Sequence, residues 1–229
     1  MSISHVMGNR VSNACLFAAC LLLSTTTQSC ADPFSDCTNR TDLDLKIKGC
    51  SQLIEQPSTG KKQLYLAYNL RGSAYAQRTE YDRAIADLTK GTELDPSDAI
   101  VFAARGEAFR RKGEVDKAIG DFNRAIGLDA HQASAYHSRG LAYLTKKDYN
   151  RAIADLSTAI EINPRSAMAF HDRALIHEAL RQREKAIDDF RAALQLDPRH
   201  RSSQDGLKRI GAAVSSTATG SELCGRHRA

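Results

Sequence analysis

One pattern of large and small residues recurs four times in this chain, at a fixed period of 34 residues. In each period a large residue, a small residue, an aromatic or His, an alanine and a second large residue follow one another. The four sets are Tyr68, Gly72, Tyr75, Ala84, Leu88; Phe102, Gly106, Phe109, Ala118, Phe122; Tyr136, Gly140, Tyr143, Ala152, Leu156; and Phe170, Ala174, His177, Ala186, Phe190. Spacings of three and four are helical, so a long period of this kind predicts a repeated helical unit.

The small positions explain how two helices fit together in each repeat. Antiparallel helices approach closely only where side chains are small, so we expect contacts at the Gly or Ala of the first helix and at the Ala of the second. The large residues are then expected to fill the core beside these contacts. Three of the four second helices are predicted to end at a proline, because the residue before a proline avoids the helical region. These prolines are Pro96, Pro164 and Pro198, and Ala130 takes the corresponding place in the second repeat.

The period and the pattern resemble those of the tetratricopeptide repeat (TPR) over residues 65–200. The resemblance implies an all-α solenoid of helix–turn–helix repeats with boundaries 65–98, 99–132, 133–166 and 167–200. It also implies a surface that holds other protein chains rather than an enzyme. The composition, with 42% hydrophobic and 26% charged residues, agrees with a folded helical protein.

Both flanks of the repeats carry weaker versions of the pattern. Residues 44–55 align with 82–93, which predicts the second helix of a degenerate leading half-repeat inside an amino-terminal cap of residues 32–64. Leu207 and Ile210 predict a capping helix over residues 201–214, since a stacked array needs its last apolar face covered. The Ser, Thr, Gly and Ala of residues 215–229 predict a disordered tail.

The amino terminus has the order of a secretory signal peptide. Arg10 precedes an apolar run from Ala14 to Leu23, and small residues at Ser29 and Ala31 predict cleavage after Ala31. We therefore expect a periplasmic or secreted protein. The alternative is a lipoprotein that is anchored to a membrane through Cys30.

Export would leave three cysteines in the mature chain: Cys37, Cys50 and Cys224. A Cys37–Cys50 disulfide is predicted to fix the amino-terminal cap, with a contribution of about 3 kcal/mol. Two buried thiols are the alternative, and no metal site is predicted there because no second Cys or His pair stands nearby. Cys224 would be free, capped or paired with another molecule.

An arginine precedes the small first-helix residue of every repeat, and an aspartate follows it 16 residues later. The pairs are Arg71 with Asp87, Arg105 with Asp121, Arg139 with Asp155, and Arg173 with Asp189. This recurrence predicts a structural ion pair between the two helices of each repeat. A ladder of four anion-binding arginines is the alternative, and it requires that these side chains be free.

The TPR resemblance implies a partner-binding groove lined by the first helices. Its lining residues in this chain are Asn69, Ala103, Glu107, Arg110, His137, Leu141, Leu144, Met168, His171 and Leu175. The Lys–Asn clamp of the chaperone-binding members is not expected, because Leu66, Ser73, Ile100 and Ala104 stand where it needs Lys or Asn. Leu141, Leu144, Leu175 and Met168 either form an apolar strip for an amphipathic helix or extended peptide, or pack on their neighbours.

Three histidines lie on the first helices of the last two repeats. His137 and His171 share the fifth place of adjacent repeats and are expected to face each other as polar groove lining; a pH-dependent pair or a metal site is the alternative. Two ligands do not make a metal site, so no metal or other cofactor is predicted. His177 takes an aromatic place and is expected in the core.

Catalytic motifs are missing from the sequence, which has no nucleophile elbow, zinc-protease helix or dinucleotide fingerprint. The formal net charge of +5 is spread among acidic residues and does not indicate nucleic-acid binding. The sequence therefore predicts an exported, non-enzymatic adaptor with a protein or peptide ligand. The alternatives are a membrane-anchored lipoprotein assembly factor and an accessory subunit of an envelope enzyme or a cryptic hydrolase.

Overall fold

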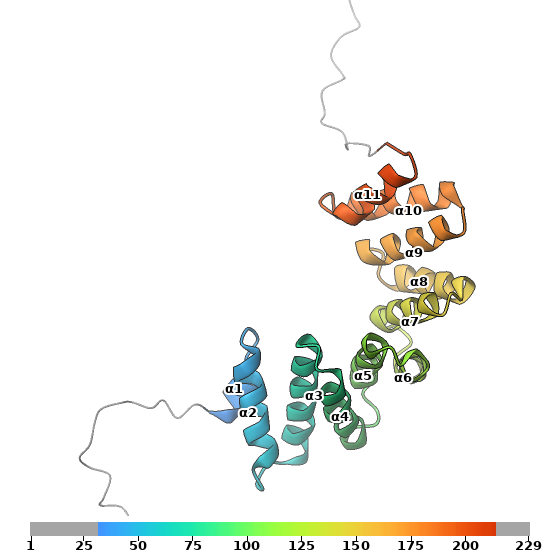
Figure 1. Ribbon diagram of the computed structural model, residues 1–229. Coiled ribbons are helices and arrows are strands. Elements are labelled where there is room, and N and C mark those ends of the chain that lie inside the picture. Colours follow the sequence, from blue (N-terminus) through green and yellow to red (C-terminus); the bar gives the residue numbers. More distant parts are fainter. Residues whose placement is uncertain (1–31, 214–229) are drawn as a thin grey trace, which may run out of the picture. The chain divides into compact units, whose positions relative to one another are not determined.

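The computed structural model describes residues 32–213, which form eleven helices and no strand (Figure 1). The predicted cleavage site, Cys30, the tail and Cys224 lie outside these residues. The helices are α1 (Pro33–Cys37), α2 (Leu43–Glu55), α3 (Lys61–Gln77), α4 (Tyr81–Leu94), α5 (Ala99–Lys112), α6 (Val115–Leu128), α7 (Ala133–Thr145), α8 (Tyr149–Ile162), α9 (Ala167–Ala179), α10 (Arg183–Leu196) and α11 (Arg201–Arg209).

The predicted all-α repeat architecture is confirmed. The two helices of each repeat pack on each other as the pairs α3 with α4, α5 with α6, α7 with α8, and α9 with α10. Each second helix also packs on the first helix of the next repeat, so helix packing continues without a break from α2 to α11. None of the helices within residues 32–213 is long and apolar enough to cross a membrane.

The predicted close contacts between small and large residues are present. A Cβ added at Gly72 would lie 2.8 Å from Leu88 Cγ, and one at Gly106 would lie 2.9 Å from Phe122 Cε1. The alanine and the large residue that the pattern gives to each second helix are at most 1% exposed. The large residues of the first helices differ from the expectation, because Tyr68, Phe102, Tyr136 and Phe170 are only half-buried. Their rings lie beside the arginines of the interhelical pairs instead of inside the core.

A left-handed residue connects the two helices of every repeat. Gly113 has φ +93°, and Thr79, Lys147 and Arg181 adopt φ values of 62°, 60° and 57° at the equivalent place. The next residue donates its backbone N–H to a carbonyl of the last turn, as Asp148 does to Tyr143 at 2.9 Å. This geometry satisfies a helix-end carbonyl but strains the three residues that are not glycine.

The second helices end at the predicted places, and α6 does so without a proline. Asp129 donates its backbone N–H to Ala125 O at 2.8 Å, and its side chain accepts a hydrogen bond from the His131 backbone N–H at 2.9 Å. Asp95 makes the corresponding contacts with Gly91 and Ser97 before its proline neighbour. The aspartate turn is therefore sufficient to end the helix, which explains why Ala130 is tolerated.

Two helix boundaries differ from the expected ranges. The first full repeat begins four residues early, since α3 starts at Lys61 after Gly60 and no helix-breaking residue separates Gly60 from Leu64. The capping helix α11 stops at Arg209 rather than 214, because Gly211 takes φ +70° just after it. Leu207 is fully buried and Ile210 packs beside it against Phe190, so α11 covers the last apolar face.

Candidate interaction surface

All four predicted interhelical Arg–Asp pairs are present, and each is bidentate. Arg139 Nε donates to Asp155 Oδ2 at 2.8 Å and Nη2 donates to Oδ1 at 2.7 Å. The other three pairs have the same two hydrogen bonds, at 2.7 to 2.8 Å. The aspartate side chains are 9–10% exposed and the arginine side chains 17–21%. Such half-buried, fork-shaped contacts orient the two helices of a repeat.

Each of these arginines also contacts the preceding second helix. Nη1 of Arg139 donates to Asn123 Oδ1 at 2.7 Å, and Nη1 of Arg173 donates to Ser157 Oγ at 2.8 Å. Arg71 Nη1 donates to Ser51 Oγ of α2 at 2.8 Å, the contact that the alignment of residues 44–55 with 82–93 would place there. For Arg71 and Arg139, the hydrogen bond with Asp raises the pKa of the guanidinium. All four side chains are therefore occupied within the fold, and an anion-binding ladder does not fit this structure.

We call the second, fifth, ninth and twelfth places of the four repeats, counted from residues 65, 99, 133 and 167, the first-helix face, because these side chains lie on α3, α5, α7 and α9. Glu107, at the ninth place of the second repeat, accepts hydrogen bonds from Arg110 at 2.8 Å and from Arg111 at 2.6 Å. Burial raises the pKa of Glu107, but the two arginines outweigh that effect and the pKa is lowered. This part of the face carries one carboxylate with two guanidinium groups.

His137 and His171 do not form the expected pair. His137 Nε2 lies 2.7 Å from Asp172 Oδ2, on the neighbouring first helix. His171 Nδ1 lies 3.0 Å from Ser203 Oγ, and its ring centroid is 4.8 Å from that of His200. Each histidine therefore points toward the next repeat along the chain, because the fifth place of a first helix contacts its carboxyl-terminal neighbour. Burial lowers the pKa of His171.

The ten expected lining residues do not share one environment. Asn69 packs its side-chain oxygen against Gly91, and Ala103 packs against a cluster of Ala99, Ala125 and Ala135. Leu144 and Leu175 pack on core clusters, while Leu141 is half-buried. Met168 is 60% exposed. Of the four residues in the expected apolar strip, two therefore pack on the core, one is half-buried and only Met168 is largely exposed.

Ile100 is the most exposed large apolar residue described, at 68%. It occupies the second place of α5, as Met168 does in α9, so the two lie at equivalent positions two repeats apart. The repeat pattern places Ile100 on the same face as the ten expected lining residues, at one of the positions that a Lys–Asn clamp would use. His177 is 7% exposed and contacts Gln182, which confirms its core position.

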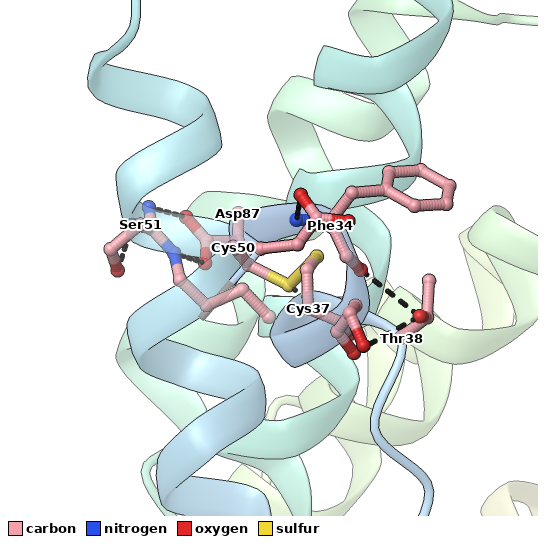
Figure 2. The surroundings of a disulfide bond; sticks show 9 residues. Phe34, Cys37, Thr38, Cys50, Ser51 and Asp87 are labelled. Carbon is pink, nitrogen blue, oxygen red and sulfur yellow. Dashed lines mark hydrogen bonds and ion pairs between the residues drawn. A yellow bond between two sulfur atoms is a disulfide. The ribbon is translucent and has the colours of Figure 1, made fainter. Parts of the chain in front are cut away.

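The predicted disulfide joins Cys37 of α1 to Cys50 of α2, and both residues are fully buried (Figure 2). Within residues 32–213, no cluster of three or more His, Cys, Asp or Glu side chains has the arrangement of a metal site.

Comparison with known proteins supports the repeat assignment. Models of the tetratricopeptide repeat match residues 69–134, 133–166 and 167–200. A comparison with curated protein sequences gave no match.

Solved structures give the same fold. MamA is 26% identical with a TM-score of 0.61, and the match covers 69% of this chain and 90% of that chain. The first TPR of Spaghetti (RPAP3), in complex with the HSP90 peptide SRMEEVD, is 29% identical with a TM-score of 0.50, over 52% of this chain and 94% of that chain. YrrB, a TPR protein, is 19% identical with a TM-score of 0.59, over 72% of this chain and 84% of that chain. On its repeat pattern, its helix pairs and these matches, the chain belongs to the tetratricopeptide-repeat family.

Proposed function

We propose that this chain is a non-enzymatic adaptor that binds a protein or peptide segment along its first-helix face. The observation that carries the proposal is the exposure of Ile100 and Met168 at one equivalent place of α5 and α9. Large apolar side chains in water at repeated positions of one face are typical of surfaces that another chain covers. The large pattern residues of the second helices, Leu88, Phe122, Leu156 and Phe190, differ in this respect because they are at most 1% exposed; Leu196, at the end of α10, is 39% exposed, less than Ile100 or Met168.

A relative with a bound peptide supports the same proposal. The first TPR of Spaghetti (RPAP3) holds the HSP90 peptide SRMEEVD, and its match covers about half of this chain. The binding mode proposed here differs from a Lys–Asn clamp, because Leu66, Ser73, Ile100 and Ala104 replace the clamp residues. We propose instead that apolar side chains of the partner contact Ile100 and Met168.

Export to the periplasm or outside the cell is part of the proposal. The signal-like amino terminus supports it, and so does the buried Cys37–Cys50 disulfide, since such bonds persist in oxidising compartments. Reading the amino terminus of the protein recovered from cells by mass spectrometry tests this part. An amino terminus at Asp32 is expected, whereas an intact Met1 or a lipid on Cys30 would contradict it.

Photo-crosslinking in intact cells tests the binding face. A photoreactive residue at Ile100 or at Met168 is expected to give a discrete adduct with one partner. Glu161 of α8 and Lys185 of α10 provide matched controls, since both are exposed but lie on second helices. Equal adducts from the control positions, or no adduct from Ile100 and Met168, would refute the proposed face.

A further inference from the structure

The leading half-repeat is held together differently from the four full repeats. By the alignment of 44–55 with 82–93, Gly49 stands in the place of Asp87, Cys50 in that of Leu88 and Ser51 in that of Thr89. Ser51 keeps its role toward the next repeat, because its Oγ accepts a hydrogen bond from Arg71 at 2.8 Å. The carboxylate of an Arg–Asp pair is absent from α2, and α1 has no arginine to meet one.

In the first three full repeats, the glycine that lets the two helices touch lies on the first helix, whereas in the leading half-repeat this glycine is Gly49 on the second helix, α2. A Cβ at Gly49 would lie 2.5 Å from Cys37 N and 2.5 Å from Asp36 Cβ. No side chain, and so no aspartate, fits at position 49 while α1 is in place. At the place where Gly72 meets Leu88 in a full repeat, Cys37 is bonded to Cys50 (Figure 2).

The disulfide is the one buried side-chain link of α1, which otherwise rests its backbone on Gly49 of α2. The helix has five residues, of which only Cys37 is buried, and Phe34 is 40% exposed. The hydrogen bonds that end it are local: Asp32 accepts from the Phe34 backbone N–H, and Thr38 Oγ1 donates to Phe34 O. A helix this short is unstable unless tertiary contacts hold it.

We propose that the Cys37–Cys50 disulfide is a redox-controlled attachment of α1, and that its reduction releases α1 and uncovers Gly49, Cys50 and Leu53 while α3 to α11 stay folded. The later repeats are joined by ion pairs and apolar packing, neither of which contains sulfur. This inference is separate from the proposed binding face, because it concerns the end of the array, but it involves the same disulfide that supports the proposed export.

The reductant that fits this step is a dithiol. One thiolate of the dithiol attacks one cysteine sulfur, the S–S bond breaks, and the other cysteine leaves as a thiolate that takes up a proton. The second thiol of the dithiol, once deprotonated, displaces the first cysteine, so two electrons and two protons reach the protein and the dithiol becomes a disulfide. Because both sulfurs are fully buried, α1 must lift before attack, and reduction is expected to be much slower than for an exposed disulfide.

Hydrogen exchange of the full chain with and without dithiothreitol tests the proposal, and differential alkylation followed by mass spectrometry establishes which sulfurs are reduced. On reduction of Cys37 and Cys50, the amides of α1 are expected to exchange roughly a hundred-fold faster, from the loss of the loop constraint. Peptides from α7 to α10 are expected to keep their rates, and reoxidation is expected to restore the protection of α1.

A second variant separates this bond from the other cysteines. Cys37→Ala with Cys50→Ala is expected to reproduce the reduced pattern and to be insensitive to dithiothreitol. Unchanged protection of α1 after complete reduction of the bond would overturn the proposal. Loss of protection throughout α3 to α10 would also overturn it, because the bond would then stabilise the whole array and not α1 alone. Dithiothreitol sensitivity of α1 in the double variant would assign the effect to another thiol and also overturn it.

Discussion

Replacing Asp155 with alanine tests whether the interhelical pairs are structural. Asp155 accepts two hydrogen bonds from Arg139, whose guanidinium also lies 5.5 Å from the Tyr136 ring centroid and 6.0 Å from that of Tyr143. After the substitution, Asn123 remains as a neutral acceptor. The guanidinium then keeps its charge in a half-buried site without a counter-ion.

The expected loss follows from this geometry. Removal of one partner of a buried, hydrogen-bonded ion pair costs about 3 kcal/mol or somewhat more, most of it from the uncompensated charge. Asp116→Ala is the matched control, because Asp116 pairs with Lys146 but its side chain is 83% exposed. An exposed pair of this kind contributes no more than about 1 kcal/mol, so the control should change little.

Urea unfolding followed by circular dichroism measures these changes, and hydrogen exchange locates them, because repeat arrays need not unfold in one step. A double-mutant cycle with Arg139→Ala is expected to give a coupling energy of about 2 kcal/mol. Partner binding should survive in Asp155→Ala at temperatures where the variant is folded. If Asp155→Ala is no more destabilising than Asp116→Ala, or if it abolishes binding in a stable chain, the structural role assigned to the pairs is wrong.

Three further predictions concern backbone, packing and pH, each measured by the free energy of unfolding. Lys147 has a left-handed backbone that strains a residue with a side chain, so Lys147→Gly should stabilise the chain by about 0.5 kcal/mol. Gly113→Ala introduces the same strain and should destabilise the chain by about 1 kcal/mol. Effects of the opposite sign would contradict the turn geometry. Gly106→Ala should destabilise the chain by about 2 kcal/mol, because the added Cβ would meet the Phe122 ring. Gly127→Ala is the control: it has open space around it and should be neutral or slightly stabilising. Equal effects of the two variants would exclude the close contact between Gly106 and Phe122. Burial lowers the pKa of His171 below its ordinary 6.5, so the unfolded chain takes up the proton first and stability should fall as pH drops below about 6.5; His171→Gln should flatten this fall, and an unchanged profile would assign it to other groups.

The fold could be predicted because its determinants recur. Gly72, Gly106 and Gly140 mark the same close contact between the two helices of three repeats. The constant spacing of 16 residues between Arg and Asp likewise identifies the interhelical ion pairs from the sequence alone. A feature that appears four times at one place is constrained by the repeat geometry and not by local context.

The surface could not be predicted to the same extent, because its contacts cross from one repeat to the next. His137 meets Asp172 and His171 meets Ser203, at separations of 35 and 32 residues that are specific to these pairs and do not recur. The left-handed turns were also missed, because Thr79, Lys147 and Arg181 give no glycine signal and only Gly113 does. Packing of Leu144 and Leu175 likewise depends on side-chain directions that the spacing leaves open.

The two ends of the array follow from the same ion-pair rule. An Arg–Asp pair needs a first helix for the arginine and a second helix for the aspartate, and each end of the described array has only one of these in full. At the start, α2 carries Gly49 in the aspartate place, and the last first-type helix, α11, carries the fully buried Leu207 in the arginine place. A retained Asp or Arg would be a half-buried charge without its partner, at a cost of several kcal/mol. Each end therefore loses the charge that would have been unpaired, and the bond to Cys37 at the start and apolar packing on Phe190 at the finish replace it.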